Sequence, residues 1–108
     1  MSKNTGFFEK VYDAARTIPY GKVCSYGTIA KHIGAAKAAR MVGWAMNGAH
    51  KVFPPVPAHR VVNRNGLLTG RAHFDYPEQM QEMLEEEGVK IINNKIINLK
   101  ELLYEFKS

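Results

Sequence analysis

The chain has 108 residues, 45% of them hydrophobic and 23% charged, which suits one globular domain with a modest core. Its single cysteine excludes an internal disulfide and a Cys-rich zinc site, and no apolar run approaches the roughly 20 residues of a membrane-spanning helix. The net charge of +5 divides into +9 over residues 1–74 and −4 over residues 75–108, which favours a polyanionic partner for the first part, although a solvated basic surface would have the same composition.

The first half of the chain predicts helices. Apolar residues recur at helical spacing over residues 5–17, which should form an amphipathic helix before a turn at residues 19–22. Ser25 can cap a short helix that Gly34 ends, and small, helix-favouring residues predict another helix over residues 36–48. Two short helices joined by a tight, glycine-containing turn predict a helix-turn-helix.

Turns and short strands are predicted next. Three prolines exclude a helix over residues 51–57, because proline lacks a backbone donor and restricts the residue before it. Apolar residues on both sides of Asn65-Gly66 predict a two-residue β-hairpin, which we interpret as a wing. The expected fold class is α+β, a winged helix-turn-helix with a small β-hairpin wing. We expect a single domain over residues 1–108 and no N-terminal domain.

The acidic last third predicts one helix and a second small hairpin. Asp75 and Glu78 resemble a capping box that would open a helix closed by Gly88. Loose alternation around Asn93-Asn94 predicts the hairpin, and residues after it should add a last helical turn or two.

Four stretches of sequence together resemble one known family. They are IPYGKVCSYG at residues 18–27, KAARMVG at residues 37–43, PAHRVVN at residues 57–63 and EEEGV at residues 85–89. Their order and spacing are similar to those of the C-terminal, DNA-binding domain of the O6-alkylguanine-DNA alkyltransferases. These enzymes have Pro-Cys-His-Arg-Val in the third stretch, and the cysteine accepts the alkyl group irreversibly. With Ala58 in its place, the sequence resembles the alkyltransferase-like proteins, which recognise alkylated guanine and flag it for nucleotide excision repair.

The resemblance implies a role for each matching residue. Tyr26 would help to rotate the damaged nucleotide out of the duplex, and Arg40 would enter through the minor groove to fill the vacated space. Arg71, where alkyltransferases commonly have tyrosine, would stack on the flipped base. The implied lesion pocket consists of Tyr26, Pro57, Ala58, His59, Val61 and Arg71, and the implied DNA contacts are Tyr26, Lys37, Arg40, Arg64 and Arg71.

The chemistry of position 58 argues against catalysis. Alkyl transfer requires a soft nucleophile, such as a thiolate activated by a neighbouring histidine, and Ala58 has no lone pair to offer. His59 and Glu87 would then be the remnant of a Cys-His-Glu relay, in which His59 holds the pocket loop through hydrogen bonds with Glu87. Cys24 is interpreted as a small buried hydrophobe. We predict no enzymatic activity, no cofactor and no metal.

Two further side chains have expected environments. Arg60 should brace backbone carbonyls or a carboxylate beside the pocket histidine rather than a phosphate. Trp44 should belong wholly or partly to the core, because it lies within a predicted helix.

Three functional hypotheses follow. The first is a non-enzymatic sensor that binds O6-alkylguanine in duplex DNA through minor-groove contact and base flipping and directs it to nucleotide excision repair. The second is a true methyltransferase inactivated by an engineered change of cysteine to alanine, and the third is a winged-helix regulator that reads the major groove. Arg71 and the lack of an N-terminal domain favour the first hypothesis over the second, and Tyr26 and Arg40 disfavour the third.

The expected partners and location follow from the first hypothesis. We expect a monomer that binds double-stranded DNA containing O6-alkylguanine and nucleotide excision repair proteins, without membrane association. The N-terminus has no signal-peptide pattern, which predicts a cytoplasmic protein, associated with the nucleoid in a prokaryote or nuclear in a eukaryote.

Overall fold

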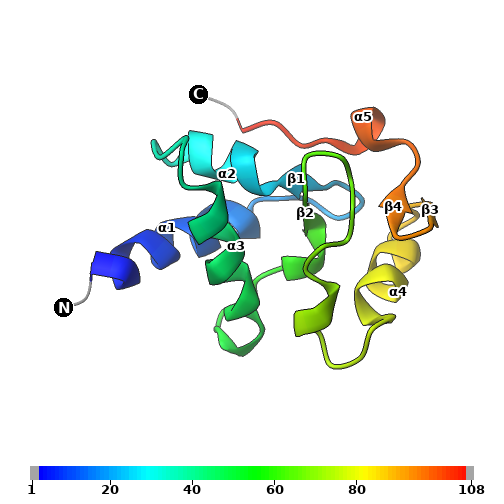
Figure 1. Cartoon of the computed structure of the whole chain (residues 1–108), viewed down its shortest axis with the longest axis horizontal. Coiled ribbons are helices and arrows are strands. Elements are labelled where there is room, and N and C mark those ends of the chain that lie inside the picture. The colour runs from blue at the N-terminus through cyan, green and yellow to red at the C-terminus, as the bar shows by residue number, and fades with distance from the viewer. Residues whose placement is uncertain (1–2, 107–108) are drawn as a thin grey trace.

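Short helices and two small β-sheets make up residues 3–106, the part of the chain that the computed structural model describes (Figure 1). The elements are α1 (Lys3–Arg16), β1 (Cys24–Ser25), α2 (Tyr26–His32), α3 (Ala39–Asn47), η1 (Ala49–Lys51), η2 (Ala58–Arg60), β2 (Val61–Val62), η3 (Arg71–His73), α4 (Gln79–Glu86), β3 (Ile91–Ile92), β4 (Lys95–Ile96) and α5 (Leu99–Leu102), where η denotes a 3₁₀ helix. The α+β fold class is confirmed. Residues 1–2 and 107–108 of the predicted domain lie outside the described residues.

Helices α1, α2 and α3 pack together on one side of the molecule (Figure 1). Val11 and Ala15, one turn apart on α1, are fully buried against Ile29 of α2 and Val42 of α3. The Tyr12 hydroxyl donates to the carbonyl oxygen of Ala45 at 3.0 Å and so satisfies the polar end of a buried ring. These three helices form the first of two hydrophobic clusters.

Local signals predict the helix-turn-helix correctly, except for the start of α3. The Ser25 hydroxyl accepts a hydrogen bond from the Thr28 N–H at 3.1 Å, and Gly34 has a φ of +81° after α2 ends. Helix α3 begins at Ala39, three residues later than predicted, because residues 35–38 form a separate turn in which the Ala38 N–H donates to the Ala35 carbonyl oxygen at 2.8 Å.

The predicted hairpin at Asn65-Gly66 is wrong in its pairing. Strand β2 pairs in parallel with β1, with Val61 opposite Cys24 and Val62 opposite Ser25. The Asn63 side chain accepts hydrogen bonds from the Asn65 and Leu67 N–H groups at 2.8 and 3.1 Å, which closes a local turn. Leu67 then forms a bridge with Lys95 of β4 instead of extending a ladder with β2.

The start of α4 also differs from its prediction. The helix begins at Gln79, and Asp75 does not cap it; the Asp75 N–H donates instead to Gln79 Oε1 at 2.9 Å. Pro77 explains the shift, because proline disfavours a helical conformation for the residue before it. Gly88 closes the helix as predicted, with a φ of +87°.

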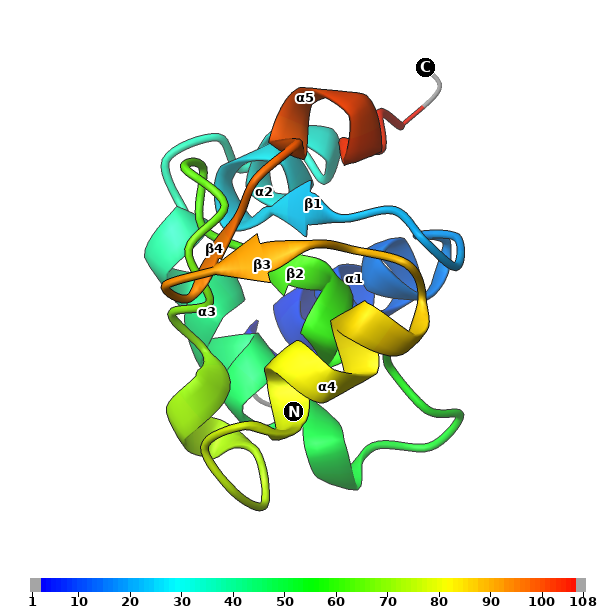
Figure 2. The same ribbon diagram turned by 90° about the vertical axis from the view of Figure 1, so that its right-hand side faces the viewer.

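The C-terminal hairpin is confirmed and leads to a segment that covers β1. Asn93 and Asn94 have φ values of 53° and 62°, as a tight turn between β3 and β4 requires. After α5, the Tyr104 N–H donates to the Val23 carbonyl oxygen at 2.8 Å, so the chain end lies beside the strand that precedes α2. Figure 2 shows α5 above β1, with α4 and the β3–β4 hairpin in front of the helical cluster.

A second hydrophobic cluster lies between α4 and the C-terminal hairpin. It contains Val23, Val62, Leu68, Met80, Leu84, Val89, Ile91 and Ile96. Strand β2 joins the two clusters, since Val61 belongs to the first and Val62 to the second. The turn η2, directly before β2, is therefore fixed at the junction of both. None of the helices over residues 3–106 is long and apolar enough to cross a membrane.

Candidate functional site

The turn η2 holds Ala58, His59 and Arg60 at the junction of the two clusters. The Ala58 N–H donates to the Val56 carbonyl oxygen at 2.8 Å, and the Arg60 N–H donates to that of Pro57 at 2.9 Å. Ala58 and His59 are each 7% exposed. A buried histidine requires a polar partner, and the partner comes from the end of α4.

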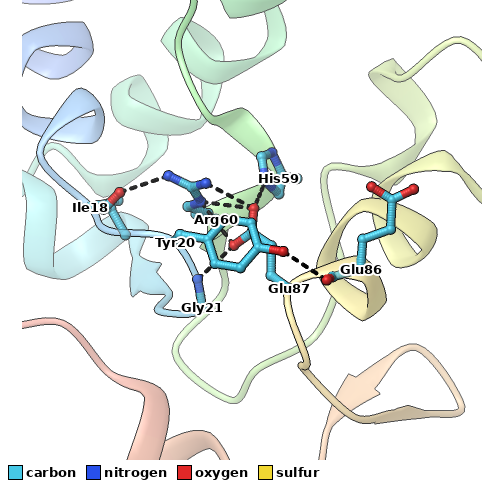
Figure 3. Close-up of polar contacts among 7 residues, drawn as sticks. All are labelled: Ile18, Tyr20, Gly21, His59, Arg60, Glu86 and Glu87. Atoms are coloured by element: carbon cyan, nitrogen blue, oxygen red, sulfur yellow. Dashed lines mark hydrogen bonds and ion pairs between the residues drawn. The ribbon is translucent and has the colours of Figure 1, made fainter.

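The Glu87 carboxylate is the centre of this site (Figure 3). It lies 2.7 Å from His59 Nε2, accepts hydrogen bonds from Arg60 Nε and Nη2 at 2.8 to 3.1 Å, and accepts one from the Gly21 N–H at 2.8 Å. Its side chain is 5% exposed. The predicted contact between His59 and Glu87 is thus observed, as is the predicted bracing role of Arg60, which also donates to the Ile18 carbonyl oxygen at 2.9 Å.

The pKa values at this site define its protonation state. Burial raises the pKa of the Glu87 carboxyl, but hydrogen bonds from Arg60, Gly21 and His59 outweigh burial and hold that pKa at about 2. Burial lowers the pKa of His59 and outweighs the opposing influence of Glu87. At neutral pH Glu87 is ionised and His59 is neutral. Because the carboxylate only accepts hydrogen bonds, Nε2 carries the imidazole proton and Nδ1 is left as an acceptor.

A cavity of about 190 Å³ lies against Ala58; we call it the Ala58 cavity. It is lined by His50, Val56, Ala58, His59, Phe74, Asp75, Gln79 and Met83. Of the six residues predicted for the lesion pocket, only Ala58 and His59 line it. Pro57 precedes η2, and Val61 is buried in the first hydrophobic cluster.

Tyr26 and Arg40 line a different hollow of about 390 Å³, which we call the Tyr26 hollow. The Tyr26 hydroxyl lies 3.4 Å from Thr69 Oγ1, and a Cβ atom at Gly70 would lie only 3.2 Å from that hydroxyl. The glycine thus permits the loop to approach the tyrosine closely. Arg71 follows at the start of η3 and is exposed. The structure therefore brings Tyr26 and Arg40 together. Arg71 directly follows Gly70 of that hollow, and its carbonyl oxygen accepts a hydrogen bond at 3.2 Å from the N–H of Phe74, which lines the Ala58 cavity.

The remaining predicted DNA contacts lie apart from one another. Lys37 is exposed and lines a third hollow, of about 470 Å³, together with Arg40; we call it the Lys37 hollow. Arg64 is exposed beside Lys95 and Asn98, next to the C-terminal hairpin.

The prediction that Trp44 belongs to the core is wrong. Trp44 is 56% exposed and lines both the Tyr26 hollow and the Lys37 hollow. The helical period contained the signal: Val42, Ala45 and Met46 are the buried residues of α3, and Trp44 points away from that face. His50 and Phe74, whose rings meet edge to face at 4.5 Å beside Ala58, also went unrecognised.

Cys24 is fully buried in β1, as predicted. Burial raises the pKa of its thiol to about 12. A thiol in this state is neither accessible nor deprotonated at neutral pH, so it does not replace the missing nucleophile.

Comparison with known proteins now decides the family. Residues 6–89 match the family model described as 6-O-methylguanine DNA methyltransferase, DNA binding domain. The chain belongs to this family. Within it, the chain has alanine directly before His59, at the position where the sequence resemblance implies the acceptor cysteine of the enzymes.

Relatives in the family fall into two groups. The chain is 41% identical over 102 residues to Alkyltransferase-like protein 1 of Schizosaccharomyces pombe, a match that covers 91% of the chain and 94% of that protein. It is 50% identical over 68 residues to the methylated-DNA–protein-cysteine methyltransferase of Salmonella typhimurium, covering 63% of the chain and 39% of the enzyme. The chain thus matches an alkyltransferase-like protein along nearly its whole length and the enzyme over less than half of the enzyme's length.

Solved structures show the same division. The crystal structure of S. pombe Atl1 in complex with damaged DNA containing O6-carboxymethylguanine matches with a TM-score of 0.82 and 41% identity, covering 97% of this chain and 99% of that one. The crystal structure of Mycobacterium tuberculosis OGT in complex with DNA matches with a TM-score of 0.63 and 43% identity. This match covers 75% of this chain and 48% of that one. The family's DNA-binding fold is thereby confirmed for this chain.

Proposed function

We propose that this protein binds O6-alkylguanine in duplex DNA without removing the alkyl group, and that it directs the lesion to nucleotide excision repair. The observation that carries the proposal is the intact His59–Glu87–Arg60 arrangement around a position with no nucleophile. The side chains that would orient and activate a thiolate are held in place, but Ala58 ends at Cβ. Such a site can hold a damaged base, and no reaction ends the encounter.

Base flipping follows from the proposed roles of Tyr26 and Arg40. A base within the duplex cannot present its O6 atom to a buried cavity, so the nucleotide must leave the stack at a cost of a few kcal/mol. Arg40 is exposed on α3 and would fill the vacated space through the minor groove, while Tyr26 would meet the phosphate beside the lesion. Arg71 would stack on the extruded base. Lys37 and Arg64 would bind phosphates.

The Ala58 cavity would receive the alkyl group. Ala58 and His59, which line this cavity, would form the wall nearest to guanine O6, with Pro57 and the backbone of Val61 on either side of them in the chain. Because alanine is smaller than cysteine, this wall leaves more room for the alkyl substituent. A protein acting on DNA would work in the nucleoid or in the nucleus, and we propose that it does so as a monomer.

Binding and chemistry are tested in one experiment. The protein is titrated onto duplexes with guanine or O6-methylguanine at one position, and the recovered DNA is then analysed for the methyl group. We expect tighter binding to the lesion duplex, with the methyl group retained. Equal affinity for both duplexes would contradict the sensor proposal, and loss of the methyl group would reveal a nucleophile other than residue 58.

Substitution of Arg40 or Tyr26 tests the flipping mechanism. We expect Arg40→Ala to weaken binding to the lesion duplex about tenfold or more, by analogy with side chains that displace a base. Tyr26→Phe should weaken binding less, because it removes only the hydroxyl that would meet the phosphate and keeps the ring. The melting temperature should not change, because the Arg40 side chain and the Tyr26 hydroxyl lie at the surface. Lys100→Ala, an exposed cation in the acidic third of the chain, is the matched control. A collapse in thermal stability would instead assign these residues to the core.

The repair step requires a separate measurement. We expect addition of the protein to raise the rate at which purified nucleotide excision repair enzymes incise a duplex containing O6-methylguanine. The Arg40→Ala variant is the control, because it retains the fold but should not hold the lesion. An incision rate that is unchanged by the wild-type protein would limit the function to binding.

A further inference from the structure

Helix α3 exposes a tryptophan on the same face as Arg40. Arg40, Trp44 and Asn47 follow one another at helical spacing, on the face opposite the buried Val42 and Met46. Trp44 is 56% exposed, although indole is among the largest apolar surfaces that a protein can bury. A single exposed apolar side chain is common on protein surfaces, so the partner of this face is indicated by the hollows and the charges around Trp44.

Two hollows lie on either side of this tryptophan. The Tyr26 hollow is lined by Tyr26, Ala39, Arg40, Gly43, Trp44, Asn47, Thr69 and Gly70, and the Lys37 hollow by residues 34–38 with Arg40, Met41 and Trp44. Arg40 and Trp44 are the two residues that line both. They therefore form a ridge on α3, the Arg40–Trp44 ridge, with one hollow on each flank.

Charge identifies the kind of partner that fits. Neither lining contains an acidic residue, and Lys37 and Arg40 are cationic. A cationic, partly apolar surface is complementary to a nucleic-acid backbone, whose phosphates are anionic and whose sugars are apolar. Arg40 and Trp44 are four residues apart, which is about 6 Å along a helix and about the width of the minor groove.

We propose that Trp44 is a second minor-groove residue of α3, whose indole packs on the deoxyribose wall opposite the wall that Tyr26 meets. This inference rests on the proposed function and adds a contact to it. The ridge enters the groove, the Tyr26 hollow receives the damaged strand, and the Lys37 hollow receives the complementary strand. Lys37 pairs with a phosphate of that complementary strand. Trp44 thus acts on every duplex, damaged or intact.

The sequence contains one tryptophan, so its fluorescence reports this contact directly. We expect the emission of the wild-type protein to change on titration with either an unmodified or an O6-methylguanine duplex. Trp44→Ala should weaken binding to both duplexes by the same factor, roughly 5- to 20-fold for a lost apolar contact of this size, and Trp44→Phe should retain most of the affinity. Ile92→Ala, which shortens a comparably exposed apolar residue on β3, is the control and should bind like the wild type.

Salt dependence separates the role of Trp44 from that of Lys37. Trp44→Ala should leave the slope of log affinity against log salt unchanged, because no ion pair is lost. Lys37→Ala should reduce that slope by about 0.9, the value for one phosphate contact. In duplexes in which one phosphate is replaced by an uncharged methylphosphonate, Lys37→Ala should no longer change the affinity when the replaced phosphate is the one on the complementary strand that Lys37 contacts. If the change in affinity caused by Lys37→Ala disappears only when a phosphate of the damaged strand is replaced, the pairing of Lys37 with the complementary strand is overturned.

The outcomes also distinguish this inference from the proposed function. If the protein shows no lesion preference but Trp44→Ala binds both duplexes more weakly, the sensor function fails and the ridge stands. If lesion preference is present while Trp44→Ala binds as tightly as the wild type and the emission is unaffected by DNA, the ridge proposal is overturned. Melting temperatures of the variants should match that of the wild type, because the indole is exposed.

Discussion

At position 58 the side chain ends at Cβ, beside a histidine that is already set for proton transfer. His59 is neutral, its Nε2 proton is directed at Glu87, and Arg60 holds the carboxylate from the other side. A thiol introduced here would face a neighbouring base whose conjugate acid is stabilised by an ionised carboxylate. This is the arrangement that activates cysteine nucleophiles in general.

The first residue-scale prediction is that Ala58→Cys gains alkyl-transfer activity. The O6–CH₃ bond would break, the methyl group would move to the new sulfur, and guanine would be restored in the DNA. We expect mass spectrometry to show a single methyl group on residue 58 after incubation with an O6-methylguanine duplex. Ala58→Cys/His59→Gln is the control and should transfer far more slowly. A variant that binds the lesion but never becomes methylated would show that His59 does not reach the thiol.

Side-chain contacts could be predicted from the sequence where a side chain has one chemically sensible kind of partner. Arg60 beside a pocket histidine needs an acceptor, and Glu87 and the Ile18 carbonyl provide it. The prediction for Trp44 failed because a position within a helix does not by itself tell which face the residue occupies, and Trp44 points away from the buried face of α3. His50 and Phe74 were beyond reach, since only the folded chain brings them to Ala58.

At the scale of elements, Glu87 joins three separate segments. It ties the end of α4 to η2 through His59 and Arg60, and to the turn before β1 through the Gly21 N–H. Tyr20 reinforces the same junction, because its hydroxyl donates to the Glu86 carbonyl oxygen at 2.8 Å. This carboxylate therefore helps to fix the orientation of η2, and with it the position of Ala58, together with the two hydrophobic clusters.

We predict that Arg60→Met destabilises the fold by about 3 kcal/mol, the usual cost of leaving a buried charge without its partner. Urea denaturation of Arg60→Met, of Glu87→Gln and of the double variant Arg60→Met/Glu87→Gln measures the coupling energy between the two side chains. The double variant should lose less stability than the sum of the single losses, since neutral glutamine requires no countercharge. Strict additivity would mean that the two side chains do not act as a pair in solution.

Element boundaries were predictable where the chemistry is local. Ser25, Gly34, Gly88 and the Asn93-Asn94 turn each mark a capping or turn position in the structure. The parallel pairing of β1 with β2 was not predictable, because it joins residues far apart in the chain and is fixed by the way Val61 and Val62 enter different clusters. The sequence around the tight Asn63 turn resembles that of a hairpin, but β2 pairs with β1, and Leu67 forms its bridge with Lys95.

For the molecule as a whole, two buried groups predict a stepwise loss of stability in acid. Glu87 has its pKa lowered from 4.5 to about 2, so its contribution is present above pH 4.5 and is lost as the pH falls toward 2. The pKa of His59 is lowered from 6.5, so the folded state resists its protonation and stability begins to fall below about pH 6.5.

Urea midpoints measured from pH 8 to pH 2 test this pH dependence. We expect a plateau above pH 6.5, a first decline attributable to His59 and a second decline between pH 4.5 and 2. His59→Gln should reduce the first decline, to which His50, whose pKa burial also lowers, contributes as well, and Glu87→Gln should reduce the second. A stability that rises on acidification below pH 6.5 would reverse the sign assigned to His59.

The environment of Cys24 should keep its thiol from reacting with thiol reagents. The only cysteine of the chain is fully buried, and its pKa of about 12 leaves almost no thiolate at neutral pH. Electrophiles that alkylate guanine should therefore spare the protein's own thiol. For the same reason, a cysteine introduced at an exposed position such as Lys100 becomes the sole attachment point for a maleimide dye, so the native chain needs no cysteine removal before site-specific labelling.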